Sequence, residues 1–393
     1  MSHDSGLDAA LKTDLASIAS LGLERTLRLT ARRHGADVET PAGRAVDFSS
    51  NDYLGLAADP RLVAAAARAM SEQGVGSTAS RLIAGNNPEH EALEGALAEF
   101  FNVERALTFS SGFLANVGTI PALVGREDVI FADSLNHASL IDGCRLSRAT
   151  VHVYPHADTD ILEGLLTAHR AKARRALIIT DGLFSMDGDT APLAQIAGLA
   201  RRFEAWTYVD DAHGVGVVGE NGRGSIAAAE LEGQIEVVVG TLGKAFGGAG
   251  AFVLGSPPLI QYLLNRARSF IFSTAMLPAQ AAAGRAALGV VSAEPLLREK
   301  VAANARLMRR RLCSECVNAL GDETSPIVPV LIGETSRTMQ IGADLAARGF
   351  LVGAVRPPTV PDGTSRLRIT ISAAHTDDQI ARFSRTLGDL VRK

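Results

Sequence analysis

Seven short apolar runs in the middle of the chain constrain the fold more than any other feature of its 393 residues. Each run is only four or five residues long and is bounded by polar residues or glycine, as is typical of strands buried on both faces. Helical stretches lie between these runs, which predicts an α/β fold with a mostly parallel central sheet and helices on both faces. The predicted strands are Ala106–Phe109, Asp128–Ala132, Thr150–Tyr154, Ala176–Thr180, Trp206–Val209, Val237–Gly240 and Ala251–Leu254.

The segment before these strands has a different pattern. Apolar residues three or four positions apart predict an amphipathic helix over residues 7–33, and a short strand is expected at residues 45–49. Two further helices are expected at residues 61–73, which are rich in alanine, and at residues 89–101, which follow the cap and proline Asn87-Pro88.

The pattern changes again beyond about residue 293. The elements expected there are a long helix (296–312), a strand (327–332), a second helix (338–348) and a last strand (365–372). We therefore expect an N-terminal arm with a short strand in residues 1–50, a large ligand-binding α/β domain in residues 51–292, and a smaller C-terminal α+β domain in residues 293–393.

Charge and cysteine content exclude several classes of function. Lys and Arg number 39 and Asp and Glu number 43, a net charge of −4, and no basic block supplies the positive surface that nucleic-acid binding needs. The first residues form no apolar core and no run reaches about 18 apolar residues, so we expect a cytoplasmic protein without a secretory signal or membrane helix. Cys313 and Cys316 form a CxxC pair without further ligands nearby, so no metal site is expected.

Two glycine-rich segments imitate nucleotide-binding motifs. Residues 214–219 spell GxGxxG after a predicted strand, but they continue into another loop rather than a helix that could receive a pyrophosphate. The segment GKAFGG around Lys244 lacks the first glycine and the Ser or Thr of a P-loop. A nicotinamide dehydrogenase therefore stays only as an alternative, beside a scaffold protein that keeps the fold without activity.

Polar residues follow four of the predicted strands, at the edge where parallel sheets bind ligands. Asp210 and His213 follow one strand and Lys244 the next, while Gly112 opens a helix after a third and His137 follows a fourth. Pyridoxal 5'-phosphate (PLP) needs a lysine that bonds to its aldehyde, a carboxylate near its ring nitrogen, a planar group over the ring, and a helix N-terminus for its phosphate. The four loops supply each of these groups, which predicts this cofactor.

Longer segments resemble a known family over nearly the whole chain. They are FSSNDYLGL (48–56), SSGFLAN (110–116), NHASLIDG (136–143), DGLFSMDGD (181–189), VDDAHGVGVVGENGRG (209–224), TLGKAFGG (241–248) and VRPPTVPDGTSRLRITISAAHT (355–376). Together they are similar to the α-oxoamine synthases, PLP-dependent acyltransferases that condense an amino acid with an acyl thioester. The resemblance implies the aspartate aminotransferase-like fold of PLP-dependent transferases. One departure is the segment at residues 76–80, which is less rich in glycine than in many members.

The resemblance also implies a role for each polar residue of the loops. Lys244 would bond to the cofactor and then act as a base, Asp210 would keep the ring nitrogen protonated, and His137 would stack on the ring. His213 would hydrogen-bond the phenolic oxygen of the cofactor, with Ser185 nearby. The residues implied at the phosphate are Gly112, Phe113 and Thr241, together with Ser273 and Thr274 from a partner subunit. A homodimer with shared active sites is therefore expected.

The last predicted strand offers an independent indication of a substrate site. Its alternating side chains place Arg366 and Arg368 on one face and Leu367 and Ile369 on the other. A guanidinium group suits a carboxylate, and the resemblance assigns the substrate carboxylate to Arg368. Further candidates for substrate contacts are Arg25, Asn51 and Thr359.

Within the family, the segments SSNDYLGL and RPPTVP are most similar to the members that condense L-alanine with a pimeloyl thioester in biotin biosynthesis, releasing CO2 and the free thiol. Members with other substrates, such as the one that acetylates glycine, share the same cofactor apparatus and stay open as alternatives. The sequence also leaves open whether the pimeloyl group arrives on coenzyme A or on acyl carrier protein.

Overall fold

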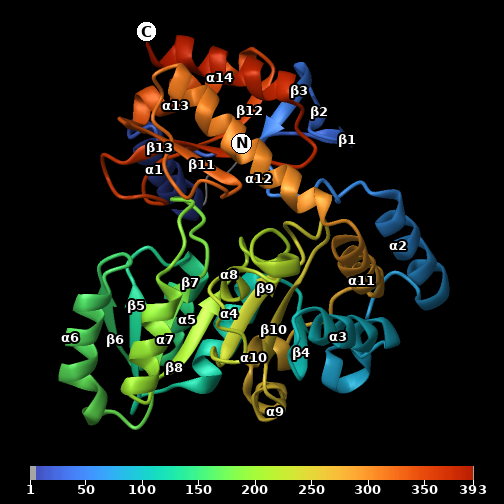
Figure 1. The fold of residues 1–393 in the computed structure, drawn as a ribbon, viewed down its shortest axis with the longest axis vertical. Coiled ribbons are helices and arrows are strands. Elements are labelled where there is room, and N and C mark those ends of the chain that lie inside the picture. Colours follow the sequence, from blue (N-terminus) through green and yellow to red (C-terminus); the bar gives the residue numbers. More distant parts are fainter. Residues whose placement is uncertain (1–5, 393) are drawn as a thin grey trace.

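The computed structural model of the chain describes residues 6–392 and places their strands in two sheets (Figure 1). The larger sheet has seven strands in the order β4-β10-β9-β8-β7-β5-β6, and β10 alone runs antiparallel to its neighbours. Its strands are β4 (Arg105–Phe109), β5 (Val129–Asp133), β6 (Thr150–Tyr154), β7 (Ala176–Asp181), β8 (Trp206–Asp210), β9 (Val237–Thr241) and β10 (Ala251–Gly255). All seven predicted strands are confirmed to within one residue at each end, as is the mostly parallel α/β fold.

Helices cover both faces of this sheet because successive strand residues point to opposite sides. Ile130 of β5 packs into a cluster with α4 (Gly112–Leu123), α5 (Ala138–Ser147) and α9 (Pro257–Arg266). The next residue, Phe131, packs on the other side with α6 (Thr159–His169) and α7 (Leu193–Arg202). Every residue of β5 and β7 is buried, which explains why these strands read as continuous apolar runs.

A second group of helices lies beside β4 and β10. The predicted helices at residues 61–73 and 89–101 are confirmed as α2 (Pro60–Gln73) and α3 (Pro88–Phe100). Both begin with proline after a residue whose side chain accepts a hydrogen bond from the first turn, Asp59 for α2 and Asn87 for α3. The chain between β4 and the smaller sheet also includes α10 (Arg268–Ile271) and α11 (Pro278–Ala293), whereas α8 (Ser225–Ala228) packs in the cluster of α6 and α7.

The smaller sheet joins the two ends of the chain. Its order is β1-β2-β3-β12-β13-β11, and β3 pairs in parallel with β12. The strands are β1 (Ala31–His34), β2 (Asp37–Thr40), β3 (Gly43–Phe48), β11 (Ile327–Gly333), β12 (Phe350–Val355) and β13 (Ser365–Thr370). The helices of this part are α12 (Leu296–Ser314), α13 (Thr335–Ala347) and α14 (Asp377–Val391). Residues 31–48 thus belong to the same sheet as residues 327–370, and the three-part domain division of the sequence analysis stays a prediction.

The N-terminal helix is shorter than predicted. The helix α1 (Gly6–Ser20) ends before Gly22, which adopts φ +67°, and the chain then extends into β1. The prediction of one helix over residues 7–33 was therefore wrong beyond residue 20. Glycine ends a helix readily because it has no Cβ to clash in the left-handed region. None of the described α1 residues is buried, and no helix within residues 6–392 is both long enough and apolar enough to span a membrane.

The GxGxxG segment forms a tight loop around a buried carboxylate. Asp211, which directly follows β8, accepts hydrogen bonds from the Ser225 backbone N–H (2.7 Å) and hydroxyl (2.6 Å). A Cβ atom on Gly214 would lie 2.1 Å from Asp211 Oδ1 and 2.5 Å from Ser225 Oγ. Gly214 is thus needed for the close packing of this loop, and no helix begins within residues 214–219.

Replacing Gly214 with alanine should destabilise the fold by about 1–3 kcal/mol, because the added methyl group overpacks the loop. The matched control is Gly198→Ala in α7, where a Cβ would meet nothing within 4 Å. That change should stabilise the protein by about 0.5–1 kcal/mol. Urea unfolding of both variants measures the difference, and equal stability of the two would contradict this role for Gly214.

Candidate active site

Four titratable side chains meet at the carboxyl-terminal edge of the larger sheet. Asp181 and Asp210 are the last residues of β7 and β8, and they are direct neighbours in the register of the two strands. Lys244 follows β9 by three residues, and His213 lies in the loop after β8. The sheet therefore gathers residues that are far apart in the sequence, as expected for this edge of a parallel sheet.

Lys244 is held by a buried imidazole. Its Nζ lies 2.6 Å from His213 Nε2, and the opposite ring nitrogen, Nδ1, lies 2.6 Å from the Tyr53 hydroxyl. Burial lowers the pKa of Lys244 to about 8, although Asp210 opposes this shift. Burial also lowers the pKa of His213, and the charges of Lys244 and Arg368 lower it further. A neutral His213 donates through one nitrogen and accepts through the other, so it orients the amine and Tyr53 together.

Asp210 is fixed by an amide and a backbone group. The Asn116 side chain donates to Asp210 Oδ2 at 2.6 Å, and the Ala212 N–H donates to Oδ1 at 3.1 Å. Asn116 in turn accepts a hydrogen bond from the Tyr208 hydroxyl at 2.7 Å. Each of these groups except Ala212 is fully buried, so the carboxylate can rotate little. Its fixed orientation suits a partner that carries one positive N–H group.

His137 lies at the same edge of the sheet. The residue is exposed, whereas Asp181 and Asp210 are buried. The His137 backbone N–H donates to Asp181 Oδ2 at 2.8 Å, and ring atom Nδ1 lies 2.7 Å from Ser139 Oγ. Although the residue is exposed, the protein around its ring partly desolvates it and so lowers the pKa of His137, a shift that Asp210 opposes. Burial and the neighbouring Asp210 raise the pKa of Asp181 well above its usual range.

The residues predicted at a phosphate lie around the start of α4. Gly112 is the first residue of this helix, Ser111 caps it, and Phe113 is exposed. A Cβ atom on Gly112 would meet nothing within 4 Å, so the helix N-terminus is open. The Thr241 hydroxyl accepts from the Gly243 N–H at 3.1 Å and donates to the Gly250 carbonyl at 2.9 Å. Free N–H groups at a helix start favour an anion.

Ser273 and Thr274 lie near the same helix start within this chain. The Ser110 hydroxyl donates to the Thr274 carbonyl at 3.5 Å, and Thr274 is exposed. Ser110, Ser273 and Thr274 line one small hollow of about 20 Å³. Their predicted contact with the phosphate of a partner subunit stays a prediction.

The smaller sheet contributes two arginines, as the alternation in β13 predicts. Arg368 donates to Asn51 Oδ1 at 3.1 Å, to Thr370 Oγ1 at 3.0 Å, and to the Ser185 carbonyl. Arg366 is buried and pairs with Asp187. Leu367 and Ile369 on the opposite face pack in the core of the smaller sheet. The structure therefore brings together the predicted residues Arg368, Asn51 and Ser185.

Arg25 and Thr359 contact each other instead. The Arg25 guanidinium donates to Thr359 Oγ1 at 3.4 Å, and both side chains are exposed. A second hydrogen bond joins the same two segments, because the Arg356 side chain donates to the Glu24 carbonyl at 2.6 Å. The two predicted residues thus form one exposed contact between the N-terminal segment and the loop after β12, without a hydrogen bond to Lys244 or Arg368.

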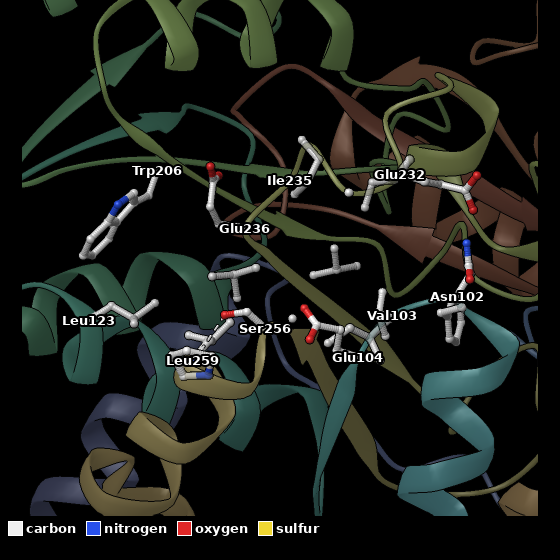
Figure 2. Close-up of a pocket in the computed structure, with 18 of the residues that line it drawn as sticks. Asn102, Val103, Glu104, Leu123, Trp206, Glu232, Ile235, Glu236, Ser256 and Leu259 are labelled. Atoms are coloured by element: carbon white, nitrogen blue, oxygen red, sulfur yellow. Dashed lines mark hydrogen bonds between the residues drawn. The ribbon is translucent and has the colours of Figure 1, made fainter.

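A separate groove of about 640 Å³ lies at the opposite edge of the larger sheet. Figure 2 shows its walls, with Trp206 and Leu123 at one end and Asn102 at the other. Trp206 and Val237 are the first residues of β8 and β9, so this groove lies at the amino-terminal edge of the parallel strands. The candidate active-site residues lie at the other edge.

Three residues of the site were not singled out from the sequence. They are Tyr53 on His213, Asn116 on Asp210, and Asp181 under His137. The segments FSSNDYLGL, SSGFLAN and DGLFSMDGD contain them, but a buried hydrogen-bond partner has no local sequence pattern of its own. Asp181 could have been found from the sequence, because a carboxylate directly after a predicted apolar strand is unusual unless it has a role.

The groups at this edge fit PLP. This edge of the sheet carries a lysine with a lowered pKa, a fixed carboxylate, an exposed histidine and an open helix N-terminus. These are the groups that bind and tune this cofactor in enzymes.

Comparisons with known proteins agree with this assignment. Residues 44–387 match the family described as aminotransferase class I and II. A curated 8-amino-7-oxononanoate synthase from Geobacter sulfurreducens is 49% identical, and the alignment covers 94% of each chain. Another from Alkalilimnicola ehrlichii is 47% identical over 98% of each chain.

Solved structures give the same result. A serine palmitoyltransferase from S. paucimobilis, with a PLP–myriocin adduct bound, matches with a TM-score of 0.93 at 28% identity, covering 100% of this chain and 99% of that chain. An 8-amino-7-oxononanoate synthase from Francisella tularensis matches with a TM-score of 0.77 at 29% identity, covering 88% and 98%. This chain therefore belongs to the aminotransferase class I and II family of PLP-dependent enzymes, in the branch of the 8-amino-7-oxononanoate synthases.

Proposed function

We propose that this chain condenses L-alanine with a pimeloyl thioester and releases CO2 and the free thiol, giving 8-amino-7-oxononanoate for biotin biosynthesis. The observation that carries the proposal is the Lys244 amine, held against His213 and close enough to Asp210 and Arg368 for both charges to act on its pKa. Relatives named for this activity, at 47–49% identity over nearly the full chain, support it.

The cofactor would supply an electron sink for the negative charge that develops at the alanine Cα when a bond there breaks. Asp210 would hold the proton of the ring nitrogen, since a nearby carboxylate favours the cationic form. His137 would cover the ring, His213 would hold the phenolic oxygen with Ser185 nearby, and the start of α4 with Thr241 would hold the phosphate.

Lys244 is suited to move a proton at the alanine Cα. With a pKa of about 8, roughly a tenth of its amine is uncharged at pH 7, far more than for an exposed lysine. A base with a pKa near the working pH transfers protons most effectively. Tyr53 and His213 keep the amine directed toward one point of the site.

Arg368 would bind the alanine carboxylate. Asn51 and Thr370 already orient its guanidinium, and its charge is buried close to Lys244. Buried guanidinium groups bind carboxylates strongly because two parallel hydrogen bonds form between fixed groups. Arg25 and Thr359 would lie farther out, on the path of the acyl chain.

We further propose a homodimer in the cytoplasm, in which Ser273 and Thr274 of one protomer reach the phosphate of its partner. Support comes from the exposure of Thr274 and from the open helix start at Gly112.

The substrate proposal is tested by measuring thiol release. L-alanine, glycine and L-serine are each paired with pimeloyl, acetyl, succinyl and palmitoyl thioesters, and alanine with the pimeloyl thioester should be preferred. Lys244→Ala should lower kcat by at least about a thousandfold, since both the covalent attachment and the base are lost. Lys300→Ala, an exposed change in α12, is the control. Preference for glycine with the acetyl thioester would refute the assignment.

Tyr53→Phe tests the orientation of His213. Removing the hydroxyl leaves His213 Nδ1 buried without its partner at 2.6 Å, which costs about 1–3 kcal/mol. We expect kcat/KM for alanine to fall about tenfold or more, with the cofactor still bound. Steady-state kinetics and the visible absorbance of the bound cofactor check this, and unchanged kcat/KM would show that Tyr53 does not orient the site.

The oligomer proposal predicts a particle of twice the chain mass in sedimentation velocity at micromolar concentration. A bulky charged change at the shared surface, Thr274→Arg, should weaken both dimer formation and PLP affinity, because one residue would serve both. A monomeric wild-type protein with full activity would exclude shared sites.

A further inference from the structure

A charged cluster outside the site joins two of its loops. The loop between Leu183 and Thr190, here called the 183–190 loop, closes on itself through a bridge between these two residues. It contains Ser185, and in Figure 1 the chain after β7 rises from the larger sheet toward the smaller one. Arg366 and Arg368 of β13 bind its Asp187 side chain and its Ser185 carbonyl.

One histidine contacts two other residues of the 183–190 loop, Phe184 and Asp189. His156, which follows β6, contacts Asp189 Oδ2 through Nε2 at 2.8 Å and Asp133 Oδ1 through Nδ1 at 3.1 Å. Its ring also packs edge-on against Phe184, with centroids 4.4 Å apart. His156 thus touches the loop at both its start and its end.

Asp133 connects this histidine to the loop of His137. It is the last residue of β5, and its side chain is 1% exposed. Its carboxylate accepts the Leu135 N–H at 2.8 Å and the Ala157 N–H at 2.8 Å. Ala157 has φ +57°, a conformation that residues with a Cβ rarely adopt, so the backbone here is held in a costly shape that aims its N–H at Asp133.

We propose that His156 is a positioning residue, which as an imidazolium bridges Asp133 and Asp189 and so fixes the 183–190 loop and the 134–137 loop relative to each other. The inference rests on the proposed function, because these loops carry Ser185 and His137. A neutral imidazole has one N–H and could donate to only one of the two carboxylates, whereas the imidazolium donates to both.

The charges on this cluster agree with the bridge. The hydrogen bonds that His156 donates to Asp133 and Asp189 raise its pKa to about 10, so the ring is charged at neutral pH. Asp189 Oδ1 is buried and has no hydrogen-bond partner among residues 6–392. Without His156, both oxygens of Asp189 would lack a hydrogen-bonding side chain among residues 6–392. The 183–190 loop would also lose the ion pair that joins it, through His156, to Asp133 of β5.

The test compares His156→Ala with His152→Ala, a histidine of β6 that stacks on His169 and touches neither loop. His156→Ala should raise the KM for L-alanine about tenfold or more and weaken PLP binding to the cofactor-free protein by a similar factor, since the loops of Ser185 and His137 loosen and Arg368 binds the first of them. The melting temperature is measured alongside. His152→Ala should leave KM and PLP affinity within about twofold of wild type.

Chemical rescue separates a bridging role from a general structural one. At about pH 6.5, added imidazole should restore the KM of His156→Ala, because its cation donates two N–H groups, whereas 1-methylimidazole should not, because its cation donates one. Equal rescue by both compounds would overturn the inference, as would a KM and a PLP affinity within about twofold of wild type.

Two further results keep the test decisive. If His156→Ala fails to fold, His156→Gln replaces it, and wild-type KM and PLP affinity in that variant would overturn the inference, since the amide can serve only one carboxylate well. If wild-type protein makes no product from alanine, the proposed function fails while the comparison of PLP affinities still tests the role of His156.

Discussion

The paired carboxylates at the ends of β7 and β8 are the constraint on which the site depends. Asp181 and Asp210 are cross-strand neighbours and both are buried, so two negative charges would stand side by side in a region of low dielectric. Two features reduce this repulsion. Burial and the charge of Asp210 raise the pKa of Asp181, which favours its uncharged form. Lys244 and the amide of Asn116 stabilise the negative charge of Asp210. A cofactor with a positive ring N–H and a negative phosphate completes this balance.

The smaller sheet acts on this site through one loop. Arg366 and Arg368 reach across from β13 to Asp187 and to the Ser185 carbonyl, while the same loop is linked to the larger sheet through Asp189 and His156. A shift of the smaller sheet would therefore move Ser185 and the guanidinium of Arg368 together. Because Asn51 also binds Arg368, the segment between β3 and α2 takes part in the same network.

Much of this arrangement could be predicted from the sequence, and the failures have physical reasons. The buried strands carry their signal locally, so all seven were located within one residue, and the groups at their ends followed from the geometry of parallel sheets. The predicted helix over residues 7–33 failed because periodicity alone did not weigh Gly22 or the pairing of β1 with β2.

Partners from distant segments could not be predicted in the same way. Tyr53 meets His213 across 160 positions, and Asn116 meets Asp210 across 94, so only the folded chain brings them together. His156 has no local sequence pattern that marks it, and its two carboxylate partners lie 23 and 33 residues away along the chain. The sequence therefore predicts the fold and the cofactor, whereas the hydrogen-bond partners that orient His213 and Asp210 are found only in the structure.

We infer that the buried edge around Asp210 makes Lys244 the one lysine that takes the cofactor. The chain has five lysines, Lys12, Lys172, Lys244, Lys300 and Lys393. Incubation with PLP, reduction with borohydride, digestion and mass spectrometry locate the modified residue. We predict one cofactor per chain, attached at Lys244, because its lowered pKa leaves more neutral amine than at an exposed lysine. Labelling spread over the other lysines, or none at Lys244, would contradict it.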